Sequence, residues 1–168
     1  LFLWGRRGNG KSMIGAVVLT EAESRGIAGR FERASDLVSN WIRGEDVAAY
    51  RRHVCRVPVL VIDELGIETP SAISLEALFG VIDDRYSNNR TTIITTNLTA
   101  ADLAGRYATV DIEAMARLID RLTQSAPVLE FKGDGYRRQI RPNYWAIARQ
   151  HAEQAAKAAT EEVPAWQD

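Results

Sequence analysis

The sequence has one cysteine, two histidines and no long hydrophobic run, and these scarcities exclude several classes of protein. A lone Cys55 cannot form an internal disulfide, which favours a reducing compartment. Cys55 and the histidines have no metal-ligand spacing, so the only metal we expect is one brought by a ligand. No apolar segment approaches the ~18 residues that a transmembrane helix needs. We therefore predict a cytoplasmic protein without a membrane partner.

The overall composition is that of an ordinary globular protein. The 168 residues fit one domain with a sizeable core, and 46% are hydrophobic and 26% charged. The formal net charge of −1 gives no global attraction to nucleic acid. Because the chain starts at Leu1, inside the expected first strand, we expect that an upstream domain precedes it. Residues 1–168 are interpreted as one domain, with 161–168 as a loose tail.

Short apolar or β-branched runs alternate with segments of helical periodicity. The predicted strands are Leu1–Trp4, Ile27–Phe31, Val57–Ile62, Thr91–Thr96 and Val128–Phe131. The predicted helices are Lys11–Ser24, a helix capped by Ser35, Gly44–Arg56, Ser74–Tyr86, Ala100–Leu103, Ile112–Leu122 and Tyr144–Thr160. Strands that alternate with helices predict an α/β fold with a parallel sheet.

A glycine-rich segment lies between the first predicted strand and the first predicted helix. It fits the phosphate-binding pattern G-x-x-x-x-G-K-[ST] with Gly5, Gly8, Asn9, Gly10, Lys11 and Ser12. Such a loop turns tightly enough to aim several backbone N–H groups at nucleotide phosphates. Lys11 is expected to reach the β- and γ-phosphates of ATP, and the Ser12 hydroxyl to ligate Mg²⁺.

Polar residues close two of the predicted strands. Asp63 and Glu64 follow the apolar run ending at Ile62, at the sheet edge where phosphates bind in open α/β folds. Acidic pairs after strands are often merely solvated, but the phosphate-binding loop favours a functional role. Asp63 is predicted to hold Mg²⁺ through water and Glu64 to polarise the attacking water. Asn97, after Thr91–Thr96, is predicted to orient that water.

The order of these motifs resembles that of the DnaC-type AAA+ ATPases, which include replicative helicase loaders and the related IstB-type transposition ATPases. The resemblance rests on LFLWGRRGNGKS, VPVLVIDELG, RTTIITTNLTAADLA, ARLIDRL and GDGYRRQ. It implies a five-stranded parallel sheet flanked by helices and a sensor-1 role for Asn97. It also implies that Arg121 is an arginine finger acting on a neighbouring subunit and that Arg137 is the sensor-2 arginine.

The function predicted from this resemblance is ATP hydrolysis by a self-associating loader of a replicative DNA helicase on single-stranded DNA. The basic residues Arg43, Arg51, Arg52 and Arg56 are a candidate contact for that DNA. One alternative keeps the ATPase but assigns it to a transposase, as in the IstB-type proteins. An alternative of another class is a monomeric P-loop kinase that acts on a small molecule.

Overall fold

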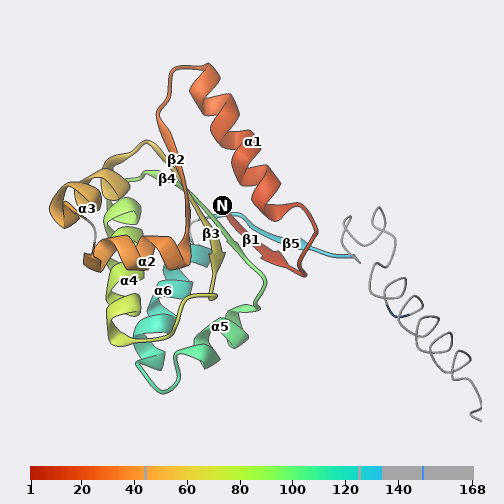
Figure 1. Ribbon diagram of the computed structural model, residues 1–168. Coiled ribbons are helices and arrows are strands. Elements are labelled where there is room, and N and C mark those ends of the chain that lie inside the picture. The colour runs from red at the N-terminus through yellow and green to blue at the C-terminus, as the bar shows by residue number, and fades with distance from the viewer. Residues whose placement is uncertain (44, 125, 134–148, 150–168) are drawn as a thin grey trace, which may run out of the picture.

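The computed structural model describes residues 1–43, 45–124, 126–133 and 149, and it places a parallel sheet with a single helix on one face and several helices on the other (Figure 1). The strands are β1 (Phe2–Gly5), β2 (Gly29–Arg33), β3 (Val59–Leu65), β4 (Thr91–Thr96) and β5 (Val128–Phe131). The helices are α1 (Lys11–Ser24), α2 (Ala34–Arg43), α3 (Val47–Arg56), α4 (Ala72–Ser87), α5 (Ala100–Arg106) and α6 (Ile112–Gln124).

The five strands lie in the order β2-β3-β4-β1-β5, and every neighbouring pair is parallel. This confirms the predicted α/β class and the five-stranded parallel sheet. Because all strands run the same way, the carboxyl ends of β1, β3 and β4, with the segments that follow them, lie at one edge of the sheet. That edge receives the glycine-rich loop, the acidic pair and Asn97.

Strand β3 explains why its apolar run shows no alternation. Its even positions, Leu60 and Ile62, pack in the larger core cluster beneath α2, α4 and α6. Its odd positions, Val59 and Val61, pack in the smaller cluster beneath α1. Successive side chains of a strand point to opposite faces, so a strand covered on both faces is apolar throughout. Helix α1 sits so close to the sheet that a Cβ on Gly15 would lie 2.7 Å from Val61 Cγ1.

The predicted boundaries differ from the observed ones in a few places. The helix Lys11–Ser24 and the strands Thr91–Thr96 and Val128–Phe131 are confirmed at both ends. Strand β2 starts two residues later than predicted, because Ile27 still closes the turn after α1 by donating its N–H to Ala22 O.

Two further differences concern a cap and a strand end. Helix α2 begins at Ala34, so the prediction that Ser35 caps it is wrong, and Ser35 lies in its first turn. Strand β3 continues through the acidic pair to Leu65 instead of ending at Ile62. The predicted helix 144–160 lies outside the described residues, apart from residue 149. Within the described part of the chain, no helix is long and apolar enough to cross a membrane.

Candidate nucleotide-binding site

The glycine-rich loop joins the end of β1 to the start of α1. Gly10 stands at the N-cap of α1 with a left-handed backbone (φ 86°), a conformation that favours glycine. Helix α1 starts at the next residue, so its first free N–H groups face the loop, together with the positive end of the helix dipole. This arrangement is a ready-made anion-binding site.

Lys11 lies at the centre of this loop and is only 5% exposed. Its ammonium donates hydrogen bonds to Gly5 O (2.8 Å), Arg6 O (2.8 Å) and Asn97 Oδ1 (3.0 Å). Burial lowers the pKa of Lys11, and the nearby carboxylates of Asp63 and Glu64 oppose that shift. All three acceptors are neutral oxygens, so the ammonium is well suited to exchange them for a phosphate.

The acidic pair lies beside the start of α1. The Ser12 hydroxyl donates to Asp63 Oδ1 at 2.7 Å, which brings together the two residues predicted to serve Mg²⁺. Their hydroxyl and carboxylate oxygens are the hard ligands that Mg²⁺ prefers, and this cation usually keeps several waters. Asp63 is buried, whereas Glu64 is partly exposed at the site edge, with a left-handed backbone (φ 59°).

Asn9 connects the glycine-rich loop to the end of the edge strand β5. Its side-chain amide donates to Phe131 O (3.0 Å) and Gly133 O (3.1 Å). Gly5 packs against the same strand, since a Cβ there would lie 2.4 Å from Phe131 O. The pattern of the loop predicted Asn9 as a phosphate contact, but its tie to β5 spans more than 120 residues. No local sequence signal reports such a contact.

Thr95 is a residue that the sequence analysis did not single out. It is 1% exposed, and its hydroxyl donates to Asp63 Oδ1 and accepts the N–H of Glu64. The only available signal was its position two residues before Asn97 on a strand adjacent to β3. The site therefore combines residues from the ends of β1, β3 and β4 with the first turn of α1.

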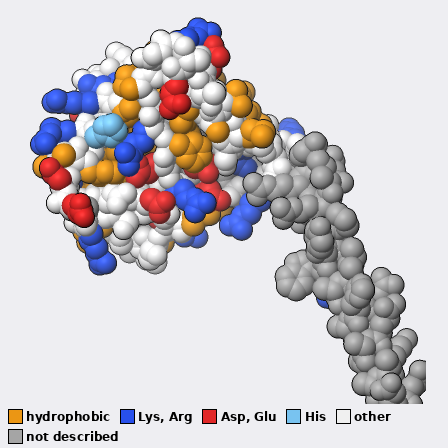
Figure 2. Space-filling model, turned by 45° about the horizontal axis from the view of Figure 1, so that its top comes forward, with side chains coloured by type: hydrophobic (Ala, Val, Ile, Leu, Met, Phe, Trp, Pro, Cys, Tyr) orange, Lys and Arg blue, Asp and Glu red, His pale blue; other side chains and the backbone are white. Residues whose placement is uncertain are grey.

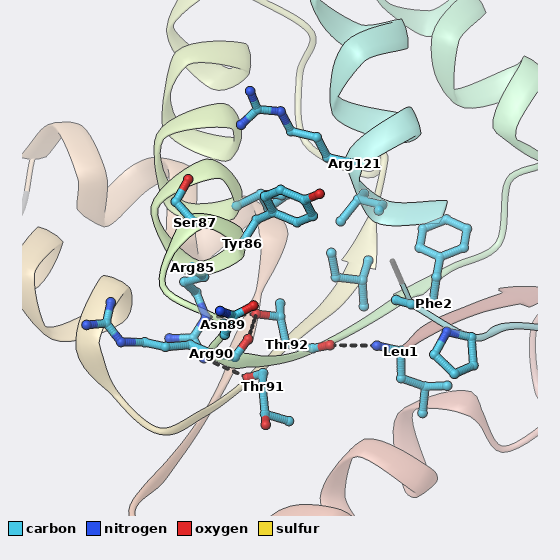
Figure 3. Close-up of a pocket in the computed structure, with 15 residues that line it drawn as sticks. Leu1, Phe2, Arg85, Tyr86, Ser87, Asn89, Arg90, Thr91, Thr92 and Arg121 are labelled. Carbon is cyan, nitrogen blue, oxygen red and sulfur yellow. Dashed lines mark hydrogen bonds between the residues drawn. The ribbon is translucent and has the colours of Figure 1, made fainter. Parts of the chain in front are cut away.

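Arg121 lies at the other end of the sheet from the glycine-rich loop. It lines a cavity of about 590 Å³ beside the starting residues of β1 and β4 (Figure 3). Its guanidinium pairs with Asp83 and lies over the rings of Phe79 (5.1 Å) and Tyr86 (5.8 Å), all three on α4. Arg121 is thus not brought together with Lys11 within one subunit. Arg137 lies outside the described residues.

The model of the IstB-like ATP binding protein family matches residues 1–143. The chain belongs to this family. This IstB-like chain is therefore an ATP-binding protein of the P-loop class, as the loop predicted. The comparison with curated proteins found no match.

The fold of the IstB-like chain is similar to solved structures of AAA+ proteins, among them a helicase loader and a replication initiator. The DnaC helicase loader is 28% identical over 79% of this chain and 77% of its own, with a TM-score of 0.66. A DnaI structure is 24% identical over 80% and 70%, with a TM-score of 0.69. AMPPCP-bound DnaA from Aquifex aeolicus is 17% identical with a TM-score of 0.65, and the match covers 80% of this chain but only 40% of DnaA. The resemblance to the DnaC-type group and the AAA+ fold are both confirmed.

Proposed function

We propose that this IstB-like chain hydrolyses ATP with Mg²⁺ at the edge of its sheet. The observation that carries the proposal is that two hydrogen-bonded pairs meet at the start of α1, Lys11 with Asn97 and Ser12 with Asp63. Lys11 binds the phosphates, Ser12 and Asp63 hold the cation, and Asn97 orients the attacking water. Glu64 accepts the proton of that water. Bound Mg²⁺ neutralises charge that develops on the phosphoryl oxygens.

Two substitutions separate binding from hydrolysis. Lys11→Ala is expected to weaken ATP binding strongly in calorimetry, while Lys132→Ala, an exposed lysine beyond β5, leaves it unchanged. Glu64→Gln keeps the side-chain shape but removes the base, so we expect normal ATP binding with nearly abolished phosphate release. Equal ATP affinity of the wild type and Lys11→Ala would refute the proposed site. If Glu64→Gln hydrolyses ATP at the wild-type rate, a residue other than Glu64 is the general base.

We also propose that nucleotide lies between subunits of a self-associated form. Support comes from the position of Arg121 at the opposite end of the strands from Lys11. A strand rises about 3.3 Å per residue, so the six residues of β4 separate the two ends by about 17 Å. Arg121 would therefore act on the nucleotide of a neighbour. Arg137 is proposed as the sensor-2 arginine on the strength of the motif GDGYRRQ alone.

The proposed role of this ATPase is to load a replicative DNA helicase onto single-stranded DNA. The 28% identity to the DnaC helicase loader supports this role, and a basic surface on α3 supports contact with DNA. Arg52 and Arg56 are exposed there and line two shallow hollows, one of them shared with His53. Figure 2 shows Lys and Arg side chains gathered near a histidine on this face.

One member of the predicted DNA-contacting set has a different position. Arg51 packs its guanidinium on the ring of Trp41 at 4.5 Å and donates to Trp41 O at 2.9 Å. It therefore holds α3 against α2 and is less available to a phosphate. We retain the exposed arginines at 43, 52 and 56 as the candidate DNA contacts.

A second candidate function keeps the same ATPase but gives it a transposase as partner. The family match favours it, because the matching model describes IstB-like ATP binding proteins. Immobilised full-length protein, offered a purified hexameric helicase and a purified transposase with ATP, distinguishes the two roles. Selective capture of the transposase would refute the loader role. The alternative of a small-molecule kinase receives no support from the comparisons.

A further inference from the structure

The two acidic residues of the site occupy an irregularity in the sheet. Ile62 pairs with Ile94, but Leu65 pairs with Thr96, so β3 advances three residues while β4 advances two. Asp63 and Glu64 therefore lie opposite the single residue Thr95. A bulge of this kind bends a strand and changes the direction of its side chains, and bulges are frequent beside active sites.

Thr95 bridges the two residues of this bulge. Its hydroxyl donates to Asp63 Oδ1 at 2.5 Å and accepts the backbone N–H of Glu64 at 3.1 Å. One hydroxyl has a single proton and two lone pairs, so donating and accepting at once fixes its orientation. The bulge interrupts the ladder between β3 and β4 here, and the side chain of Thr95 supplies a bond in its place.

One of these bonds restrains the carboxylate of Asp63, and the other restrains the backbone of Glu64. Ser12 also donates to Asp63 Oδ1, at 2.7 Å. Two hydroxyls thus donate to the same oxygen and fix the orientation of the Asp63 carboxylate. Glu64 has a backbone φ of 59°, which residues with a side chain rarely adopt unless the surroundings hold them there. The bond from Glu64 N–H to Thr95 contributes to that hold.

We propose that Thr95 is a positioning residue that sets Asp63 for the cation and Glu64 for the attacking water. The inference rests on the proposed ATPase function. Thr95 itself lies on β4 and is buried. It therefore acts through Asp63 and Glu64 on the neighbouring strand β3.

Thr95→Val removes the hydroxyl at nearly constant shape, and Thr95→Ser retains it. Loss of a partner that orients a metal ligand typically lowers metal affinity or activity about 10- to 100-fold. For Thr95→Val we expect a fall of that size in kcat and in the apparent Mg²⁺ affinity. Nucleotide affinity measured in EDTA is expected to be unchanged. Thr95→Ser is expected to stay within about 3-fold of wild type, and Thr91→Val, on the exposed start of β4, serves as the control.

The Mg²⁺ dependence of fluorescent-nucleotide binding is the decisive readout, because it needs no turnover. The proposal is supported if Thr95→Val, but not Thr95→Ser, needs a higher Mg²⁺ concentration for half-maximal nucleotide binding. Equal Mg²⁺ dependence in the Val and Ser variants overturns it, as does a loss of binding that is the same with and without Mg²⁺. If Thr95→Val fails to fold, Thr95→Ala replaces it in the same comparison with Ser. If the wild type binds nucleotide but releases no phosphate, the ATPase proposal fails while this binding assay still decides the role of Thr95.

Discussion

Replacement of Arg121 by alanine is the most demanding test of the proposed subunit interface. If Arg121 stabilises transition-state charge on a neighbour's nucleotide, Arg121→Ala binds ATP normally and hydrolyses it poorly. Arginine fingers contribute about 10³- to 10⁵-fold to the rate in well-studied systems, which corresponds to about 4–7 kcal/mol of transition-state stabilisation. Arg117→Ala is the matched control, since Arg117 is an exposed arginine one turn earlier on α6 that pairs with Glu113.

The ion pair and ring contacts of Arg121 predict a much smaller structural effect. Its ion pair with Asp83 has side chains 36% and 37% exposed, and such pairs contribute about 0.2–1 kcal/mol. Each of its two aromatic contacts adds about 0.5–1 kcal/mol at an exposed site. We therefore expect Arg121→Ala to lower the free energy of unfolding by about 1–3 kcal/mol in urea titrations. A rate loss of 10³-fold with a fully folded protein cannot arise from that destabilisation.

Mixing two inactive variants tests whether the arginine acts across an interface. A Lys11→Ala subunit has a defective pocket but retains Arg121, and an Arg121→Ala subunit has the reverse. At hybrid interfaces an intact pocket meets an intact arginine, so the mixture regains part of the phosphate release that each variant lacks. The assay uses high protein concentration and single-stranded DNA to promote assembly. A mixture that forms oligomers by light scattering and stays inactive would show that Arg121 is not a trans-acting finger.

Three further predictions concern DNA, the loop after β3 and a buried arginine. Arg52→Gln with Arg56→Gln is expected to reduce the slope of log affinity for single-stranded DNA against log salt by about 1.4 in anisotropy titrations, whereas Arg25→Gln at the C-cap of α1 leaves it unchanged. Glu68→Ala leaves a backbone N–H and a tyrosine hydroxyl without their buried acceptor and is expected to lower the free energy of unfolding by about 2 kcal/mol or more, measured by urea denaturation. Arg85→Met removes a fully buried guanidinium that donates to five backbone carbonyls, so we expect a loss of at least about 3 kcal/mol by the same measurement. Unchanged stability in either variant would contradict its assigned contacts.

The sequence predicted the elements that have strong local signals and misjudged those set by distant contacts. Thr91–Thr96 is a β-branched run bounded by polar residues, so both of its ends followed from local chemistry. The limits of β2 depend instead on its register with β3, in which Gly29 pairs with Val59, and no local pattern encodes that pairing.

The candidate site divides in the same way. The loop around Lys11 was readable because its spacing carries its own chemistry. The bulge at Glu64 and its bond to Thr95 were not readable, because they arise from a mismatch between two strands 31 residues apart. At this bulge the pairing of the strands imposes the left-handed backbone conformation of Glu64, which glutamate rarely adopts by itself.

The placement of Lys11 and Arg121 also restricts the symmetry of any assembly. If a site needs the pocket of one subunit and the arginine of another, the two interacting surfaces are different parts of the molecule. They lie at opposite ends of the parallel strands, so one contact uses the carboxyl ends of one sheet and the surface beside the strand starts of the next. A two-fold dimer pairs the same patch of both subunits, so it meets this requirement only if that single patch spans both ends of the strands. Head-to-tail contacts instead close into a ring or continue as a helical filament. In an open filament the terminal subunit that lacks a donor of Arg121 is inactive, so the activity per subunit rises as the oligomers lengthen.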